Sequence, residues 1–131
     1  LIGHVVSKVS GCLYCQAHTL LGAHNFGITD AKLADVWTYA SSPLFTEAER
    51  VALDFALAAA AQPNAVTDEL FERLRMRWSE VQIVEILGVV AMFGFLNRWN
   101  DSMATKLEAV PDAVAREAMG ASWSAGKHAK N

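Results

Sequence analysis

Apolar residues recur every three or four positions along most of the chain, which is the spacing of one face of an α-helix. The first such segment covers residues 1–10, and the second runs from about residue 12 to 24 and stops near Asn25 and Gly27. Thr29 then supplies the capping residue of a third helix, which Pro43 terminates. We find no convincing strand pattern, so the chain is predicted to be all-α.

Two capping boxes, in which Ser or Thr precedes Glu or Gln by three positions, mark further helix starts. The box at Thr46 opens an alanine-rich helix to about Ala61, and the box at Ser79 opens the longest element, from Glu80 to about Met103. Thr67 starts a helix between these two, and Pro111-Asp112 begins a short last one. We therefore expect about six helices in a single domain over residues 1–131, without internal repeats.

The longest predicted helix is apolar around nearly its whole circumference. Such a helix is buried on all sides, so we expect it in the core or in a subunit interface. Its most apolar stretch, Ile86 to Leu96, contains 11 residues. A membrane-spanning helix needs roughly 20 apolar residues, so no membrane association is predicted.

Composition narrows the class of protein. The chain has 131 residues, of which 53% are hydrophobic and 19% charged, as in a globular domain. The net charge is −3, and the basic residues form no stripe, which argues against nucleic-acid binding. There is no visible secretory leader. Because Leu1 is not a methionine and lies within helical pattern, we expect further residues ahead of it.

The candidate chemistry lies in residues 10–19. Both cysteines of the chain, Cys12 and Cys15, are three positions apart at a helix start, and His18 follows after another three. Such a pair can form a disulfide within one turn, and the helix N-terminus favours a thiolate. At about 100° per residue, the three side chains share an arc of about 120°, so His18 can exchange a proton with Cys15. A pair of this kind is typical of a cytoplasmic protein rather than of a secreted disulfide framework.

Other interpretations of the cysteine pair remain open. The two could be structural residues beside a core histidine. A zinc site is the more specific alternative, with His24 as a fourth potential ligand. On a continuous helix His24 lies about 180° from Cys15, however, so a zinc site would need His4 or His128. Thioredoxin-type chemistry expects the pair after a strand, whereas here it follows helical pattern.

Residues 11–19 resemble the core motif of alkylhydroperoxidase D-like proteins in the carboxymuconolactone decarboxylase superfamily. Further resemblance extends over nearly the whole chain. It includes Phe45 to Ala56, Val66 to Leu74, Val84 to Asp101 and Trp123 to His128.

The resemblance implies a helical domain that assembles as a homo-oligomer (a dimer, trimer or hexamer) and acts as a thiol-dependent peroxidase. Cys15 would attack a hydroperoxide and become a sulfenic acid, Cys12 would condense with it to a disulfide, and an external dithiol would reset the pair. His18 would act in the proton relay with Tyr14 as an assistant. No metal or other cofactor is implied.

The chain departs from the best-known family pattern at two places. The pattern has a glutamate twelve positions before the first cysteine, which falls just ahead of Leu1. It also has a histidine four positions after the second cysteine, where this chain has Thr19 and carries His18 one position earlier.

Four other features were weighed for function. We expect His4 at the surface or the edge of the core, and His24 at the end of its helix, where the dipole favours a cation. A functional role for Glu85 is the weaker interpretation. The polar cluster Asn97 to Asp101 is a solvated helix end, part of a pocket or a contact between subunits. Two alternative functions of the same fold are a lactone decarboxylase, which does not depend on a cysteine pair, and a non-catalytic redox-sensing oligomer.

Overall fold

The computed structural model describes residues 1–129, which form helices and loops and contain no strand. Seven α-helices and three short 3-10 helices follow one another along this part of the chain, one α-helix more than expected. The all-α prediction is confirmed. The α-helices are α1 (Ile2–Val9), α2 (Leu13–Asn25), α3 (Asp30–Ala34), α4 (Glu47–Ala60), α5 (Asp68–Arg75), α6 (Glu80–Met103) and α7 (Ala109–Met119), and the 3-10 helices are η1 (Asp35–Thr38), η2 (Gly120–Ser122) and η3 (Gly126–Ala129).

Local sequence signals set most of the helix starts. The side chains of Thr29, Thr46, Thr67 and Ser79 each accept a hydrogen bond from a backbone N–H of the first turn of the helix that follows. The two predicted capping boxes are both complete. The last helix is a correction, because it begins at Ala109 rather than at Pro111-Asp112. Proline has no N–H to donate and the first turn needs none, so Pro111 fits inside that turn.

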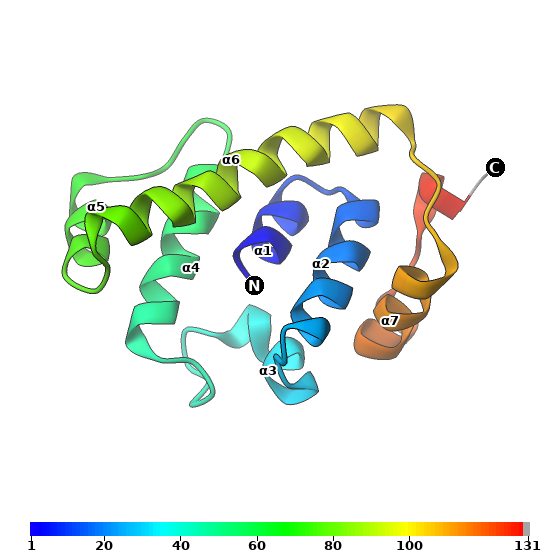
Figure 1. Ribbon diagram of the computed structural model, residues 1–131, viewed down its shortest axis with the longest axis horizontal. Helices are drawn as coiled ribbons and strands as arrows, with labels where there is room; N and C mark the ends of the chain where they lie inside the picture. Colours follow the sequence, from blue (N-terminus) through cyan, green and yellow to red (C-terminus); the bar gives the residue numbers. More distant parts are fainter. Residues whose placement is uncertain (130–131) are drawn as a thin grey trace.

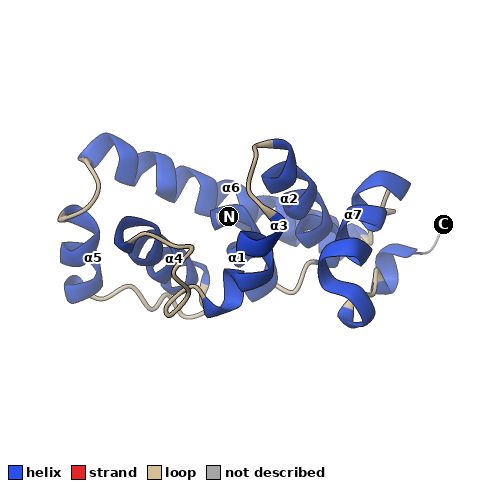
Figure 2. Cartoon of the chain, turned by 90° about the horizontal axis from the view of Figure 1, so that it is seen from below, coloured by secondary structure: helices blue, strands red, loops and turns tan. Residues whose placement is uncertain are grey.

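Helix α6 lies across the other helices (Figure 1), and it packs against α1, α2, α4 and α5. The short α1 is enclosed by α2, α4 and α6, so its central residues are fully buried. Seen from below, α5 and α7 lie near opposite ends of an elongated bundle (Figure 2). Three apolar clusters fill the interior, around Val5 and Leu53, around Leu20 and Trp123, and around Phe55 and Leu74.

The prediction that α6 is buried on all sides is wrong for the chain by itself. Ile83, Ile86 and Val90 face the core, whereas the opposite face is open to solvent. Because α6 lies on top of the bundle, only one of its faces meets other helices. The exposed apolar residues of α6 are Val81, Val84, Leu87, Met92, Phe95, Trp99 and Met103.

Helix α6 also bears on the membrane question. By length and composition it is the one helix within residues 1–129 that could cross a bilayer. The whole helix is longer than the 11-residue apolar stretch counted in the sequence. Core helices of soluble proteins pass the same test, so this property alone is weak support for a membrane location.

Candidate active site

The cysteine pair lies where α1 gives way to α2. Gly11 adopts a positive φ of 73°, which lets the chain turn sharply between the two helices. Cys12 is the N-cap residue of α2, and its Sγ accepts a hydrogen bond from the backbone N–H of Cys15 at 3.3 Å. Cys15 follows one turn into the helix. Both are free cysteines, and their exposed fractions are 0% and 3%.

The two thiols have pKa values shifted in opposite directions. The hydrogen bond with the Cys15 thiol lowers the pKa of Cys12 against an opposing effect of burial, and the Cys15 backbone N–H lowers it further. For Cys15, the hydrogen bond with Cys12, burial and the charge of Cys12 raise the pKa well above its ordinary value. The first proton therefore leaves Cys12, and the remaining one stays on Cys15. This is the expected behaviour of a coupled pair at a helix N-terminus.

The end of α6 supplies a further group to the pair. The side-chain amide of Asn100 donates to Cys15 Sγ at 3.8 Å and to the carbonyl oxygen of Leu96 at 3.0 Å. The contact with Cys15 lowers the pKa of that thiol, but it does not outweigh the effects that raise it. Asn97, one turn earlier, is buried, and neither atom of its amide group has a hydrogen-bond partner within residues 1–129. The polar cluster at the end of α6 is therefore partly interior rather than a fully solvated helix end.

His18 and Tyr14 face the start of α7. The Nε2 of His18 lies 2.8 Å from one carboxylate oxygen of Glu108, and the Tyr14 hydroxyl donates to the other at 3.2 Å. The two rings are 4.4 Å apart. Partial burial raises the pKa of Glu108, but hydrogen bonds from its own backbone N–H, His18 and Tyr14 together bring it below its ordinary value. Within residues 1–129, Glu108 is the hydrogen-bond partner of the His18 ring, so a relay role for His18 stays a prediction.

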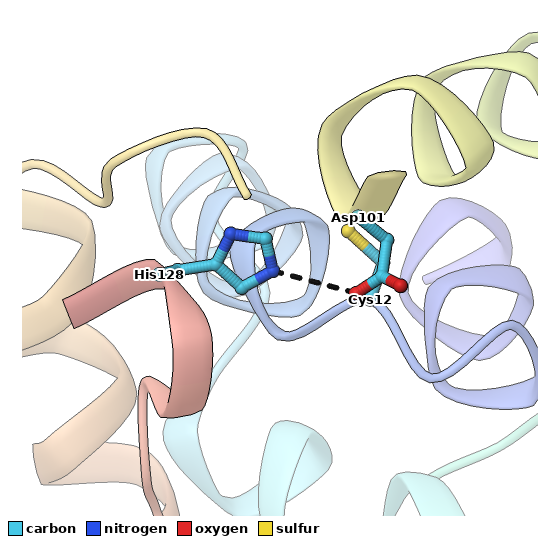
Figure 3. A group of neighbouring side chains, drawn as sticks. All are labelled: Cys12, Asp101 and His128. Carbon is cyan, nitrogen blue, oxygen red and sulfur yellow. Dashed lines mark ion pairs between the residues drawn. The ribbon is translucent and has the colours of Figure 1, made fainter. Parts of the chain in front are cut away.

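A second group of polar side chains meets at Cys12. Cys12 Sγ, a carboxylate oxygen of Asp101 and a ring nitrogen of His128 lie within 4.8 Å of one another (Figure 3). Asp101 comes from the last turns of α6, and His128 comes from η3 in the carboxyl-terminal tail. Lys127 Nζ forms an ion pair with the second carboxylate oxygen of Asp101 at 2.7 Å.

This arrangement bears on the zinc alternative. His128 does join Cys12, as that alternative required, but His24 is exposed and pairs with Asp30 at 3.6 Å. The carboxylate of Asp101 already forms an ion pair with the ammonium group of Lys127. Within the described residues the cluster offers three ligand groups, one fewer than a structural zinc site takes.

His4 lies behind the pair on α1, and its position corrects the expectation of a surface or core-edge residue. Its exposed fraction is 2%, because α1 is enclosed on several sides. The hydroxyl of Thr19 donates to backbone carbonyls of α2, including that of Cys15 at 2.8 Å, so it accepts from His4 Nδ1 at 3.0 Å. Burial, together with nearby positive charges, lowers the pKa of His4 to about 4. His4 therefore acts as a neutral link between α1 and α2.

His4 and Thr19 also border an apolar pocket of about 460 Å³. The pocket opens between α1, α2, α4 and α6, and Phe26, Trp78 and Phe93 contribute aromatic rings to its wall. Neither cysteine lines it. Glu85, the remaining candidate, is exposed on α6 and lies outside both features.

Glu108 and Lys127 were not found from the sequence. Glu108 precedes Ala109 as the N-cap residue of α7, and its only sequence signal is an acidic residue at a helix start, a common arrangement. Its link to His18 spans 90 positions, which no local pattern reveals. His128 had been named only as a possible zinc ligand and Asp101 only as part of the polar cluster at the helix end, so their position beside Cys12 was not predicted.

The fold and the site together define a class of protein, namely a helical domain that carries two free cysteines at the start of one helix. Residues 1–58 match the carboxymuconolactone decarboxylase family, in agreement with the family resemblance of the sequence. Two similar proteins, both bacterial, are uncharacterized. YnjA of Escherichia coli K12 is 30% identical over 79% of this chain, and YdfG of Bacillus subtilis 168 is 25% identical over 72% of it.

Solved structures give the same fold. The debrominase Bmp8 superimposes with a TM-score of 0.83 at 35% identity over 89% of this chain, and one of its structures holds 2,3,4-tribromopyrrole in a cysteine-to-alanine variant. Atu0492 of Agrobacterium tumefaciens, of unknown function and linked to AhpD-type antioxidant defence, has a TM-score of 0.76 at 23% identity over 82% of this chain. The chain spans 57% of YnjA and 63% each of YdfG and Bmp8, so it covers less than two thirds of these proteins.

Proposed function

We propose that this protein is a dithiol–disulfide oxidoreductase that reduces a hydroperoxide through Cys12 and Cys15. The observation that carries the proposal is the geometry of the pair. Two free thiols lie one helical turn apart, and a backbone N–H holds the sulfur that ionises first. A thiolate at a helix N-terminus is the reactive form of cysteine in this chemistry.

The proposed reaction consumes both thiols. Cys15 passes its proton to His18 as its sulfur attacks the outer oxygen of the hydroperoxide. The O–O bond breaks, the outer oxygen stays on Cys15 as a sulfenic acid, and the inner oxygen leaves as an alcohol when it receives that proton. Cys12 then attacks that sulfur, and water leaves as the disulfide forms. An external dithiol reduces the disulfide and restores both thiols. His18, held by Glu108 and assisted by Tyr14, returns a proton to the departing oxygen.

The experiment is hydroperoxide consumption by the full-length protein with a dithiol as reductant. Cys15→Ser and Cys12→Ser run beside it, with Ser10→Ala as a control at an exposed neighbour of the motif. We expect Cys15→Ser to abolish turnover and Cys12→Ser to trap a sulfenic acid, which mass spectrometry of the protein detects. Turnover that survives both serine substitutions would refute the proposal and favour the lactone chemistry of the family. Disulfide formation without turnover would favour the redox-sensing oligomer.

A second candidate reaction is favoured by the likeness to the debrominase Bmp8. The same dithiol could reduce a carbon–bromine bond, so that a brominated aromatic and two thiols give the debrominated ring, a disulfide and hydrogen bromide. The assay distinguishes the two reactions if 2,3,4-tribromopyrrole replaces the hydroperoxide and bromide release is measured. Bromide release that requires both cysteines, without peroxide consumption, would replace the peroxidase reaction with this one.

A further inference from the structure

The side chain of His128 is held in one tautomer. Its exposed fraction is 0%, and its Nδ1 lies 2.8 Å from the backbone carbonyl oxygen of Thr105. A carbonyl oxygen only accepts hydrogen bonds, so Nδ1 carries the ring proton. The backbone of His128 is also fixed, because its carbonyl oxygen accepts from Leu107 N–H at 2.9 Å. Its Nε2 is therefore an acceptor in a fixed place.

That acceptor has no donor among the described residues. His128 Nε2 is buried without a hydrogen-bond partner, and the atom it faces is Oδ1 of Asp101 at 3.5 Å, which is also an acceptor. A buried polar atom without a partner costs free energy, and two facing acceptors add repulsion. A proton on Nε2 would relieve both, since the imidazolium could then donate to the Asp101 carboxylate.

The Cys12 thiol is the proton source in this group. Figure 3 shows the sulfur of Cys12 beside the Asp101 carboxylate, with the ring of His128 turned toward both. The other groups around the His128 ring do not supply a proton. Lys127 is engaged by Asp101, and the Tyr14 ring lies 5.9 Å away with its hydroxyl bonded to Glu108.

We propose that His128 is the proton acceptor for Cys12 and that Asp101 stabilises the imidazolium so formed. This inference deepens the proposed function and rests on it for its use in catalysis. The proton leaves Cys12 Sγ for His128 Nε2, which gives a thiolate and an imidazolium. When the thiolate attacks the sulfenic acid of Cys15, the imidazolium proton passes to the departing hydroxide, so that water is released and His128 is neutral again. The Cys12 sulfur forms the S–S bond with its lone pair, the electron pair of the S–O bond leaves with the hydroxide, and Cys12 is oxidised as Cys15 is reduced.

The test measures the thiolate directly and needs no substrate. The rate at which iodoacetamide alkylates Cys12 is followed against pH in full-length protein carrying Cys15→Ser, which leaves one thiol. His128→Asn keeps an amide donor for the Thr105 carbonyl and lacks the distal nitrogen. We expect it to slow alkylation at pH 7 by about tenfold for each unit by which the midpoint of the pH profile rises. His24→Asn is the matched control at an exposed histidine, and it should leave the profile unchanged.

Asp101→Asn distinguishes the proposal from a purely repulsive effect of the carboxylate. The charge of Asp101 by itself raises the pKa of Cys12, so its removal alone would speed alkylation. If Asp101 stabilises the imidazolium, its removal slows alkylation instead. Faster alkylation in Asp101→Asn, or an unchanged profile in His128→Asn, would overturn the inference. If His128→Asn fails to fold by circular dichroism, Asp101→Asn decides alone.

These outcomes are separable from the failure of the proposed function. A protein without peroxidase activity can still show the His128-dependent profile of Cys12. Equally, turnover by both thiols with an unchanged profile would leave the reaction in place and remove His128 from it.

Discussion

Replacing Cys12 by alanine or by serine should have different effects on stability, because its sulfur caps α2. The Sγ of Cys12 accepts the Cys15 N–H at 3.3 Å, and a serine hydroxyl at the same position can accept it as well. Alanine cannot. Loss of an N-cap acceptor costs about 0.5–2 kcal/mol. Cys12 has an exposed fraction of 0%, so water cannot take over its role, and we expect a cost of about 1–2 kcal/mol.

For a chain of 131 residues, each kcal/mol shifts the melting temperature by about 4 °C. The Cys12→Ala variant should therefore melt about 4–8 °C below Cys12→Ser. The measurement is thermal unfolding by circular dichroism at 222 nm with reductant present, so that no disulfide contributes. Substitutions of Cys15 are the matched comparison, because its sulfur caps no helix N–H and accepts only the long contact of 3.8 Å from Asn100, so the gap between serine and alanine should be smaller there. Equal melting temperatures for the two Cys12 variants, or a higher one for alanine, would refute the capping role.

Three further predictions concern other parts of the fold. The folded-state pKa of His4 is about 4, against an ordinary value of 6.5, so between these pH values the unfolded chain binds a proton that the folded chain does not. The free energy of unfolding should therefore fall by roughly 3 kcal/mol as the pH drops through that window. Urea unfolding at several pH values should show a smaller loss for His4→Gln. The Tyr39 hydroxyl donates to Asp54 at 2.6 Å, so Asp54→Asn should lower the free energy of unfolding by about 1–2 kcal/mol. Burial first and then Asp54 raise the pKa of Tyr39, so the same substitution should bring that pKa back toward its ordinary value in an ultraviolet titration. If the exposed face of α6 forms the homo-oligomer that the family resemblance implies, Phe95→Glu should reduce the mass in sedimentation velocity and change the stability of the chain by no more than about 0.5 kcal/mol. An unchanged mass would place the interface elsewhere.

The parts of the fold that were predictable depend on neighbours in sequence. A capping box, a proline or a glycine acts within one turn, so Thr46 and Ser79 sufficed to place α4 and α6. The same holds for the cysteines, whose position at a helix start follows from their spacing and from Gly11. The start of α7 was misplaced because Pro111 is compatible with several positions of a first turn.

The remaining features depend on contacts between distant residues. The apolar pattern of α6 shows that the helix is hydrophobic, but the packing of the bundle determines which of its faces is covered. In the site, Asn100 reaches Cys15 across 85 positions and Glu108 reaches His18 across 90. A single sequence contains no signal that pairs such residues. The thiol pair could therefore be predicted, and the groups that surround it could not.

The tail that carries His128 has a consequence for protein synthesis. The ribosome makes the amino-terminal part first, at roughly 5–20 residues per second, so Cys12 is made on the order of ten seconds before His128. During that interval Cys12 lacks His128, and for most of it Asp101 as well, so its thiol has the reactivity of an ordinary cysteine at a helix start. The arrangement shown in Figure 3 is complete only when η3 has reached the end of α6. A nascent chain thus acquires its full thiol environment only after His128 has been made.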